Sequence, residues 1–288
     1  MHSRFTLHVS RIMKTALLRR PRMCQAFTLI ELLVVISIIA ILAALLLPAI
    51  SRARLTAQKG KAQLQAGQIA NAINSYETDN SGKFPVSSVG ANNAMTSAST
   101  APAPLGPEDY TYGATFKTPS SPYTYIVQTP GVSYPPTNSE VMAVLMDMES
   151  WTANPGFTIE HGHVKNPQRT HYLNATSVSA TNQPGVGPDG IYRDPWGNPY
   201  VITIDLNYDG KARDAFYRLP AVSVDPSDLN PPPKRGLNGL IPTMINGAPV
   251  YEANSPVMVW SAGPDGMIDP YSPANKGANK DNILSWKQ

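Results

Sequence analysis

The chain has 288 residues, of which 42% are hydrophobic and 15% charged, a composition that excludes a disordered protein and allows one or two domains. Six of the 23 basic residues and none of the 20 acidic residues precede position 27, so the rest carries a net charge of −3, and the pI of 8.9 does not indicate nucleic-acid binding. The single cysteine, Cys24, lies in the same N-terminal segment, which excludes a disulfide-stabilised domain after it.

Residues 1–26 form a basic leader that precedes an apolar run over residues 27–50. A run of about 20 apolar residues spans a bilayer, whereas the apolar part of a secretory signal has only about 7–15. The run leads into the sequence SRAR, which is a poor signal-peptidase site. Because positive charge stays in the cytoplasm, we expect a single membrane span in contact with lipid, a cytoplasmic N-terminus and an exported C-terminal part. A plain membrane anchor is the alternative interpretation.

The sequence AFTLIE at residues 26–31 is more specific than an anchor requires. Together with the basic leader and Pro48, it resembles the N-terminus of type IV prepilins and of type II secretion pseudopilins. This resemblance implies that a prepilin peptidase cuts between Ala26 and Phe27 and methylates the new amino group of Phe27. The family usually has Gly at the position of Ala26, and alanine is the next smallest side chain.

The acidic residue Glu31 in the apolar run needs a partner, because an ionised carboxylate in lipid is costly. The resemblance implies that Glu31 pairs with the Phe27 amine of a neighbouring subunit when helices bundle into a filament, which sets the axial register. The alternative is a carboxylate that lies near the lipid headgroups in contact with water. Pro48 lacks a backbone donor, so we expect it to kink or locally open the helix.

Residues 51–84 are predicted to continue the membrane helix as an amphipathic helix. Apolar residues at helical spacing define its buried face: Leu55, Ala62, Ala66, Ile69, Ile73 and Tyr76. The sequence TDNSGKFP predicts the end of the helix, since Asn and Gly favour a C-terminal cap and Pro85 does not continue a helix.

Residues 85–190 are interpreted as a variable insertion, rich in Pro and Tyr, with a short helix near 139–151. We expect Ser139 to cap this helix, its methionines to fill the core, and the tyrosines to pack loops onto the domain. Four residues that follow the helix offer zinc-ligating atoms: Glu160, His161, His163 and His171. No cysteine supports a zinc site, and neighbouring Gly, Asn and Pro favour an irregular loop. The chain contains no nucleophile elbow, phosphate loop or HExxH motif, so an enzyme is not expected.

Residues 191–288 are predicted to form a small antiparallel β-domain. A turn in DPWGNPY precedes an expected alternating strand at 200–205, and the Asp-Gly at 209–210 predicts a hairpin with residues 214–219. A further strand is expected within 256–263. The sequences DPWGNPY, SAGPDG and, near the terminus, DNILSW resemble the major pseudopilin of type II secretion.

The loop after the last long strand, residues 261–282, is a candidate calcium site. It is rich in Gly, Asn and Pro and has little apolar area to offset its backbone entropy, and Ca²⁺ gathers 6–8 oxygen ligands. The resemblance implies as ligands the carboxylates of Asp265 and Asp281, the carbonyl of Ala262, and Ser261. Asn282 stands where the family often has a second acid, and Asp269 is an alternative ligand.

A second, weaker calcium candidate begins like an EF-hand loop with Asp205, Asn207 and Asp209. Its twelfth position is Phe216, where an EF-hand needs a bidentate glutamate. We therefore interpret this sequence as a turn first and as a calcium loop second.

These features together predict an α+β fold of the type IV pilin kind, in which a long N-terminal helix carries a small antiparallel sheet. The resemblance implies a pseudopilin, major or minor, that polymerises with itself and with minor pseudopilins into a periplasmic pseudopilus. It further implies prepilin peptidase, an inner-membrane assembly platform and an assembly ATPase as partners, and no nucleic acid. The alternatives are a type IV pilin for adhesion, twitching or DNA uptake, and a membrane-tethered ligand-binding or enzymatic domain.

Overall fold

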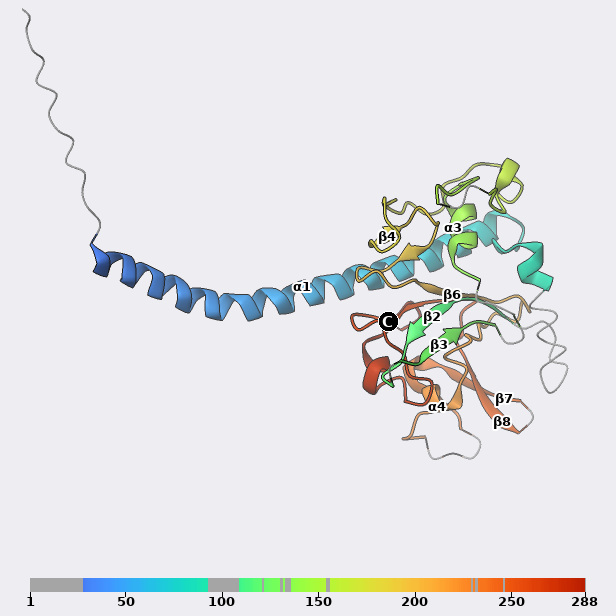
Figure 1. Cartoon of the computed structure of the whole chain (residues 1–288). Coiled ribbons are helices and arrows are strands. Elements are labelled where there is room, and N and C mark those ends of the chain that lie inside the picture. Colours follow the sequence, from blue (N-terminus) through green and yellow to red (C-terminus); the bar gives the residue numbers. More distant parts are fainter. Residues whose placement is uncertain are drawn as a thin grey trace, which may run out of the picture. The chain divides into compact units, whose positions relative to one another are not determined.

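The structure, a computed structural model, describes residues 28–92, 109–120, 122–129, 132, 136–153, 156–228, 230, 233–245 and 247–287. The leader and the predicted cut between Ala26 and Phe27 therefore lie outside the described residues. The chain divides into two compact units, residues 1–51 and 52–288. It is an α+β protein with a long N-terminal helix followed by small antiparallel sheets, as the sequence predicted (Figure 1).

Helix α1 covers Leu29–Asp79, and its first half is apolar all round. The large side chains between Leu29 and Ile50 are exposed, which suits a segment that is surrounded by lipid. Among the described helices, α1 is the one that is long and apolar enough to cross a membrane. Pro48 lies inside this helix.

In the second unit, α1 is amphipathic and buries one stripe of side chains. The stripe consists of Ala62, Ala66, Ile69, Ala72, Ile73 and Tyr76. Leu55 was expected on it but is 40% exposed, because it lies about two turns before the first buried residue, Ala62. The helix ends at Asp79, and the Gly82 amide, at φ +77°, donates to the Glu77 carbonyl over 2.9 Å.

The main sheet of the described chain has four antiparallel strands in the order β1-β6-β9-β10. The strands are β1 (Tyr110–Tyr112), β6 (Val201–Ile204), β9 (Val257–Ser261) and β10 (Ile283–Leu284). In the centre, Val201 of β6 lies opposite Trp260 of β9. Edge strand β1 comes from the segment 85–190, so this segment is part of the sheet, whereas the sequence analysis confined the sheet to residues 191–288.

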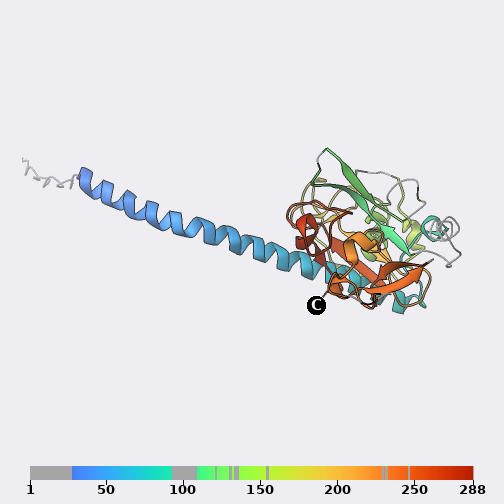
Figure 2. The same ribbon diagram turned by 90° about the horizontal axis from the view of Figure 1, so that it is seen from below.

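Both faces of the main sheet are covered. On one face, Ile202, Ile204 and Val259 pack with the stripe of α1 and with helix α3 (Ser139–Leu145). The C-terminal half of α1 runs along the β-strands in both views (Figure 1 and Figure 2). On the other face lies a second, aromatic core: Phe116, Phe216, Tyr217, Tyr251 and Trp260. All residues of β6 are consequently buried, and the expected alternation of buried and exposed side chains is absent.

Shorter elements surround the main sheet. Three strand pairs are β2 (Ala114–Lys117) with β3 (Thr124–Val127), β4 (Gly185–Val186) with β5 (Tyr192–Arg193), and β7 (Ile241–Ile245) with β8 (Ala248–Glu252). Short helical elements are η1 (His161–His163), α4 (Pro220–Ser223), η2 (Leu237–Gly239), η3 (Gly277–Asp281) and residues 88–92.

The prediction of a hairpin at the Asp-Gly of residues 209–210, with residues 214–219 as its second strand, is wrong. Residues 215–218 form a turn, and Ala212 makes an isolated bridge to Ala253. The cause is Asp214, whose buried carboxylate accepts the backbone amides of Phe216 (2.9 Å) and Tyr217 (2.8 Å). An aspartate that binds amides two and three residues ahead folds the chain into a turn and removes those amides from a strand ladder.

The short helix α3 begins differently from the prediction. Ser139 is its first residue rather than its cap, and the helix ends at Leu145 rather than near 151. Asn138 stands at the cap position, but its side chain donates to the carbonyls of Tyr192 (3.0 Å) and Tyr200 (2.8 Å). Asn138 therefore connects the start of α3 to β5 and to the residue before β6, and it does not cap its own helix. The methionine expectation is met at Met142, which is fully buried.

Candidate assembly and cation sites

Glu31 and Thr28 form a capping box at the start of α1. The Glu31 carboxylate accepts the Thr28 amide over 2.9 Å and the Thr28 hydroxyl over 2.7 Å, while the Glu31 amide donates to that hydroxyl over 3.3 Å. A Thr-x-x-Glu sequence satisfies amides that a helix start leaves without partners. Glu31, the acid in the apolar run, therefore also stabilises the start of its own helix, a role that was not predicted from the sequence.

The loop after β9 brings several of the predicted calcium ligands together. Gly263, next to Ala262, has φ +70°, and a Cβ there would meet the Asp281 carbonyl at 2.3 Å, so only glycine allows this approach. Burial raises the pKa of Asp265, and the charge of Asp281 raises it further. Oδ1 of Asp281 and Oδ1 of Asn282 are buried with no hydrogen-bond partner in the described structure. Such oxygens are costly unless a cation or water binds them.

Ser261 and Asp269 do not fit this ligand set as well. The Ser261 hydroxyl donates to the buried carboxylate of Asp194 and accepts the Gly263 amide over 3.0 Å. The Asp269 carboxylate accepts the Tyr271 amide over 2.9 Å, and the Asp265 carboxylate likewise accepts the Met267 amide over 2.9 Å. Asp281, whose buried Oδ1 has no partner among the described residues, adds to burial in raising the pKa of Asp265, so these two acids form the core of the candidate site.

The EF-hand-like sequence at residues 205–210 folds as a turn that uses its own oxygens. The two carboxylate oxygens of Asp205 accept the amides of Tyr208 (2.6 Å) and Gly210 (2.8 Å). Asn207 accepts the Asp209 amide over 2.9 Å. The twelfth position, Phe216, is fully buried in the aromatic core and offers no ligand.

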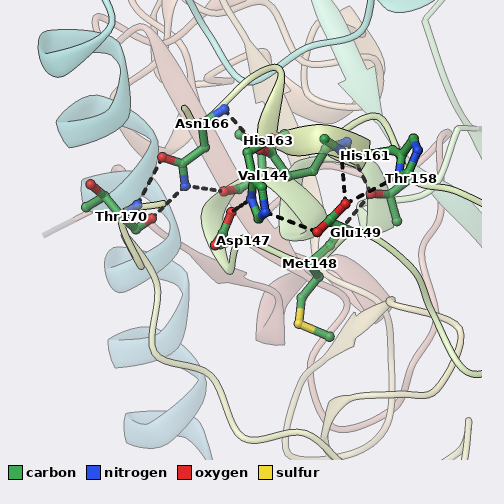
Figure 3. Close-up of polar contacts among 11 residues, drawn as sticks. Val144, Asp147, Met148, Glu149, Thr158, His161, His163, Asn166 and Thr170 are labelled. Atoms are coloured by element: carbon green, nitrogen blue, oxygen red, sulfur yellow. Dashed lines mark hydrogen bonds and ion pairs between the residues drawn. The ribbon is translucent and has the colours of Figure 1, made fainter. Parts of the chain in front are cut away.

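A group of potential metal ligands that the sequence analysis did not assemble lies beside α3. One ligand atom each of Asp147, Glu160 and His163 fall within 4.8 Å of one another. His163 Nδ1 is 2.7 Å from Asp147 Oδ1, and Nε2 is 3.0 Å from Glu149 Oε1 (Figure 3). Burial raises the pKa of Glu160, and the charge of Asp147 adds to this effect.

The zinc set named from the sequence is therefore corrected. Glu160 and His163 belong to this group, but His161 stacks on Phe157 with 3.6 Å between ring centroids, and His171 is exposed outside it. Asp147 was missed, because it lies 13 residues before Glu160 and only the folded chain brings the two together. The acidic pair in MDMES, which lies inside the helix predicted near 139–151, was the available signal.

Comparison with known proteins bears on the N-terminal segment. Residues 21–47 match the family model of the prokaryotic N-terminal methylation motif. The match includes the cut expected after Ala26 and the acid Glu31, and it indicates a type IV pilin-like protein. It implies processing by a prepilin peptidase and pilus-like assembly. No curated protein and no solved structure matches the chain.

Proposed function

We propose that this type IV pilin-like chain is a pseudopilin of a type II secretion system. The observation that carries the proposal is the contact between the two C-terminal sequences that resemble the major pseudopilin. Asn198 of DPWGNPY donates to the carbonyl of Gly263 in SAGPDG over 2.8 Å, and Asp194 accepts the hydroxyl of Ser261. The two contacting residues Asn198 and Gly263 are 65 positions apart, and the two sequences build one structural unit, which supports the proposal.

In this proposal the function is structural and not enzymatic. Subunits are stored in the inner membrane with the N-terminus in the cytoplasm. Their leader is removed, the new N-terminal amine is methylated, and the mature subunits join a helical filament in the periplasm. The polytopic platform and the assembly ATPase drive growth of the filament, which pushes folded proteins through an outer-membrane channel. The exposed apolar side chains of residues 29–50 supply the surface on which neighbouring helices pack.

Deletion of the gene in its native host tests the proposal. Loss of secreted proteins from the medium, with their accumulation in the periplasm, is the expected result, and re-expression of the wild-type chain restores export. Normal secretion together with loss of twitching, adhesion or DNA uptake would instead identify a type IV pilin.

Processing gives a direct prediction. The mature chain from the native host should begin with N-methylated Phe27, because the leader charge and the AFTLIE sequence place the cut there. N-terminal mass analysis measures this. The Ala26→Gly variant should be cut at least as fast as the wild-type chain, since glycine is the residue that the family usually has before the cut. A mature chain that starts after residue 50 would contradict a pilin-like anchor.

We propose Ca²⁺ as a ligand of the loop after β9, with Asp265 and Asp281 at its core. Calcium at about 100 times its Kd adds about 2.7 kcal/mol to a folded state that alone binds it. For a domain of this size the melting temperature should rise by about 5–10 °C. The measurement uses a soluble fragment from about residue 51 onward, with limited proteolysis within 262–281 as a second readout.

Variants localise the calcium effect. The double replacement Asp265→Ala and Asp281→Ala should abolish the shift, whereas Asp209→Ala, in the EF-hand-like turn, should leave most of it. Full stabilisation of the double variant by calcium would place the site elsewhere, and no effect on the wild-type fragment would rule out a calcium clamp.

A further inference from the structure

Helix α3 ends in a way that places an acidic side chain where glycine is usual. The Met148 amide donates to the Ala143 carbonyl over 2.8 Å, and the Asp147 amide to the Val144 carbonyl over 3.4 Å. These two bonds define a Schellman motif, and its left-handed residue is Asp147, with φ +55°. The motif turns the chain sharply and directs the Asp147 carboxylate toward His163 (Figure 3).

The loop that carries the other two residues is fixed to the same helix end. Thr158 donates its hydroxyl to the Met148 carbonyl over 2.7 Å. Asn166 joins loop and helix, because its amide donates to Glu160 Oε1 over 3.0 Å and its Nδ2 to the Val144 carbonyl over 3.4 Å. The His163 amide donates to the Glu160 carbonyl over 2.7 Å, so the two side chains are held one turn apart.

Carboxylates outnumber imidazoles in this group of described residues. Three carboxylates, those of Asp147, Glu149 and Glu160, surround the imidazole of His163, and Glu149 also lies 3.3 Å from Nδ1 of the half-exposed His161. Glu160 is fully buried, and its Oε2 has no hydrogen-bond partner among the residues described. The hydrogen bond between His163 and Asp147 leaves Oε2 of Glu160 without a partner. A buried carboxylate oxygen in this state is costly, and a bound cation would supply its partner.

We propose that Asp147, Glu160 and His163 bind one divalent transition-metal ion, for which Zn²⁺ is the best probe. Two carboxylates and one imidazole make a mixed oxygen and nitrogen set that suits Zn²⁺, whereas Ca²⁺ and Mg²⁺ favour oxygen alone. Bonds of about 2.0–2.2 Å in a tetrahedral site place two ligand atoms of one ion about 3.3–3.6 Å apart. The three ligand atoms lie within 4.8 Å of one another, so side-chain rotations that bring them roughly 1 Å closer would close the site on an ion.

The two ring nitrogens of His163 have different partners in the proposed site. Nδ1 faces the metal, because it lies beside the other ligand Asp147. Nε2 donates to Glu149, which orients the ring and makes it a stronger ligand, as carboxylate–histidine pairs do in metal sites. The side chains of Asp147 and His163 are 10% and 15% exposed, and Glu149 is 41% exposed, so an ion enters from the Glu149 side and keeps water in its fourth position.

Because Asp147 follows α3 and the other two ligands lie in the loop at 158–166, the ion would crosslink this loop to the end of α3. The only cysteine of the chain, Cys24, lies in the leader, so the domain has no disulfide for this purpose. The same loop contacts α1, because the Tyr76 hydroxyl donates to the Lys165 carbonyl over 2.7 Å. The metal site thus stabilises the junction of both helices with the loop, and it does not depend on the proposed role in secretion.

The test uses the full chain, purified in detergent and freed of metal with EDTA. Titration with Zn²⁺ alone should give one equivalent bound and a higher melting temperature, and X-ray absorption should show one imidazole with oxygen ligands. His163→Gln and Glu160→Gln should each weaken Zn²⁺ binding by about 100-fold or more, since each loses a ligand. His171→Gln is the matched control, because it removes an exposed histidine outside the group.

The melting temperature in EDTA separates loss of a ligand from loss of the fold, and it should stay near the wild-type value in all three variants. Absence of stoichiometric Zn²⁺ binding in the wild type overturns the proposal, as does equal binding by His163→Gln. If a variant does not fold, the wild-type X-ray absorption spectrum decides, and two or more imidazole ligands would overturn the site.

Discussion

Replacing Glu31 with glutamine is expected to abolish filament assembly while the chain still inserts into the membrane. Insertion depends on the apolar run, and a segment with one charge fewer inserts at least as well. We expect assembly to require the negative charge, because the amine of Phe27 on a neighbouring subunit would otherwise be buried among apolar side chains without a partner. We expect loss of most filaments, measured by shearing or cross-linking of cells that contain equal amounts of the variant in the membrane.

The capping box allows this charge effect to be separated from a folding effect. Glutamine at position 31 still accepts the Thr28 amide and hydroxyl, so Glu31→Gln keeps the helix start, whereas Glu31→Ala loses both the cap and the charge. Thr28→Ala is the matched control: it removes the hydroxyl at a cost of about 1 kcal/mol and keeps the charge.

The charge hypothesis predicts that Thr28→Ala assembles and that both Glu31 variants do not. A different pattern, in which Glu31→Gln assembles and Thr28→Ala and Glu31→Ala fail together, would assign Glu31 to the helix start alone.

Residues whose role depends on local spacing were predictable. The stripe from Ala62 to Tyr76 and the end of α1 at Asp79 follow from helical periodicity and from the Asn and Gly after it. Helical periodicity also placed Leu55 on the stripe, where it is wrong. Periodicity shows which side of a helix is apolar, but it does not show how much of that side the rest of the domain covers. The N-terminal AFTLIE sequence was recognisable for a similar reason, since its information lies within six consecutive residues.

Residues whose role depends on distant partners were not predictable. β6 was expected to alternate, but Ile202 faces α1 and Val201 faces the aromatic core, so both sides are buried. The strand β1 has three residues and no pattern that marks it as an edge of the main sheet. The metal group shows the same limit: Glu160 and His163 were noticed for their closeness in sequence, but Asp147 joins them only through the end of α3. Asp214 falls in a predicted strand, whereas in the structure its carboxylate binds donors of Phe216, Tyr217 and Trp260 in the aromatic core.

Replacing Asp214 with alanine is expected to unfold most of the domain. Asp214 is fully buried beside Trp260, and four donors share its carboxylate. They are the amides of Phe216 (2.9 Å) and Tyr217 (2.8 Å) on Oδ1, and the Thr203 hydroxyl (2.7 Å) and Trp260 Nε1 (3.0 Å) on Oδ2. Burial raises the pKa of Asp214, and the four donors oppose this effect by stabilising the ionised form.

Alanine leaves the two amides and the Trp260 N–H buried without an acceptor, whereas the Thr203 hydroxyl can donate to the Thr111 hydroxyl 3.0 Å away. At about 1–3 kcal/mol each, the three losses approach the roughly 5–15 kcal/mol that hold a domain together. Asparagine keeps one oxygen and should therefore cost less than alanine. Its amide group opposes the N–H of Trp260, whereas the hydroxyl of Thr203 can turn to accept. The expected order of stability is wild type, Asp214→Asn, Asp214→Ala, and urea unfolding of the fragment 52–288, followed by tryptophan fluorescence, measures it.

Asp209→Ala is the matched control for this series, since Asp209 is an exposed aspartate whose carboxylate accepts one backbone amide, that of Lys211. Its loss should cost about 1 kcal/mol or less. If Asp214→Ala were no less stable than Asp209→Ala, the donors around Asp214 would have other acceptors, and the turn at 215–218 would not depend on this carboxylate. A large difference between the two variants, with Asp214→Asn between them, would show that one buried acid holds strands β6 and β9 to the turn that replaced the predicted hairpin.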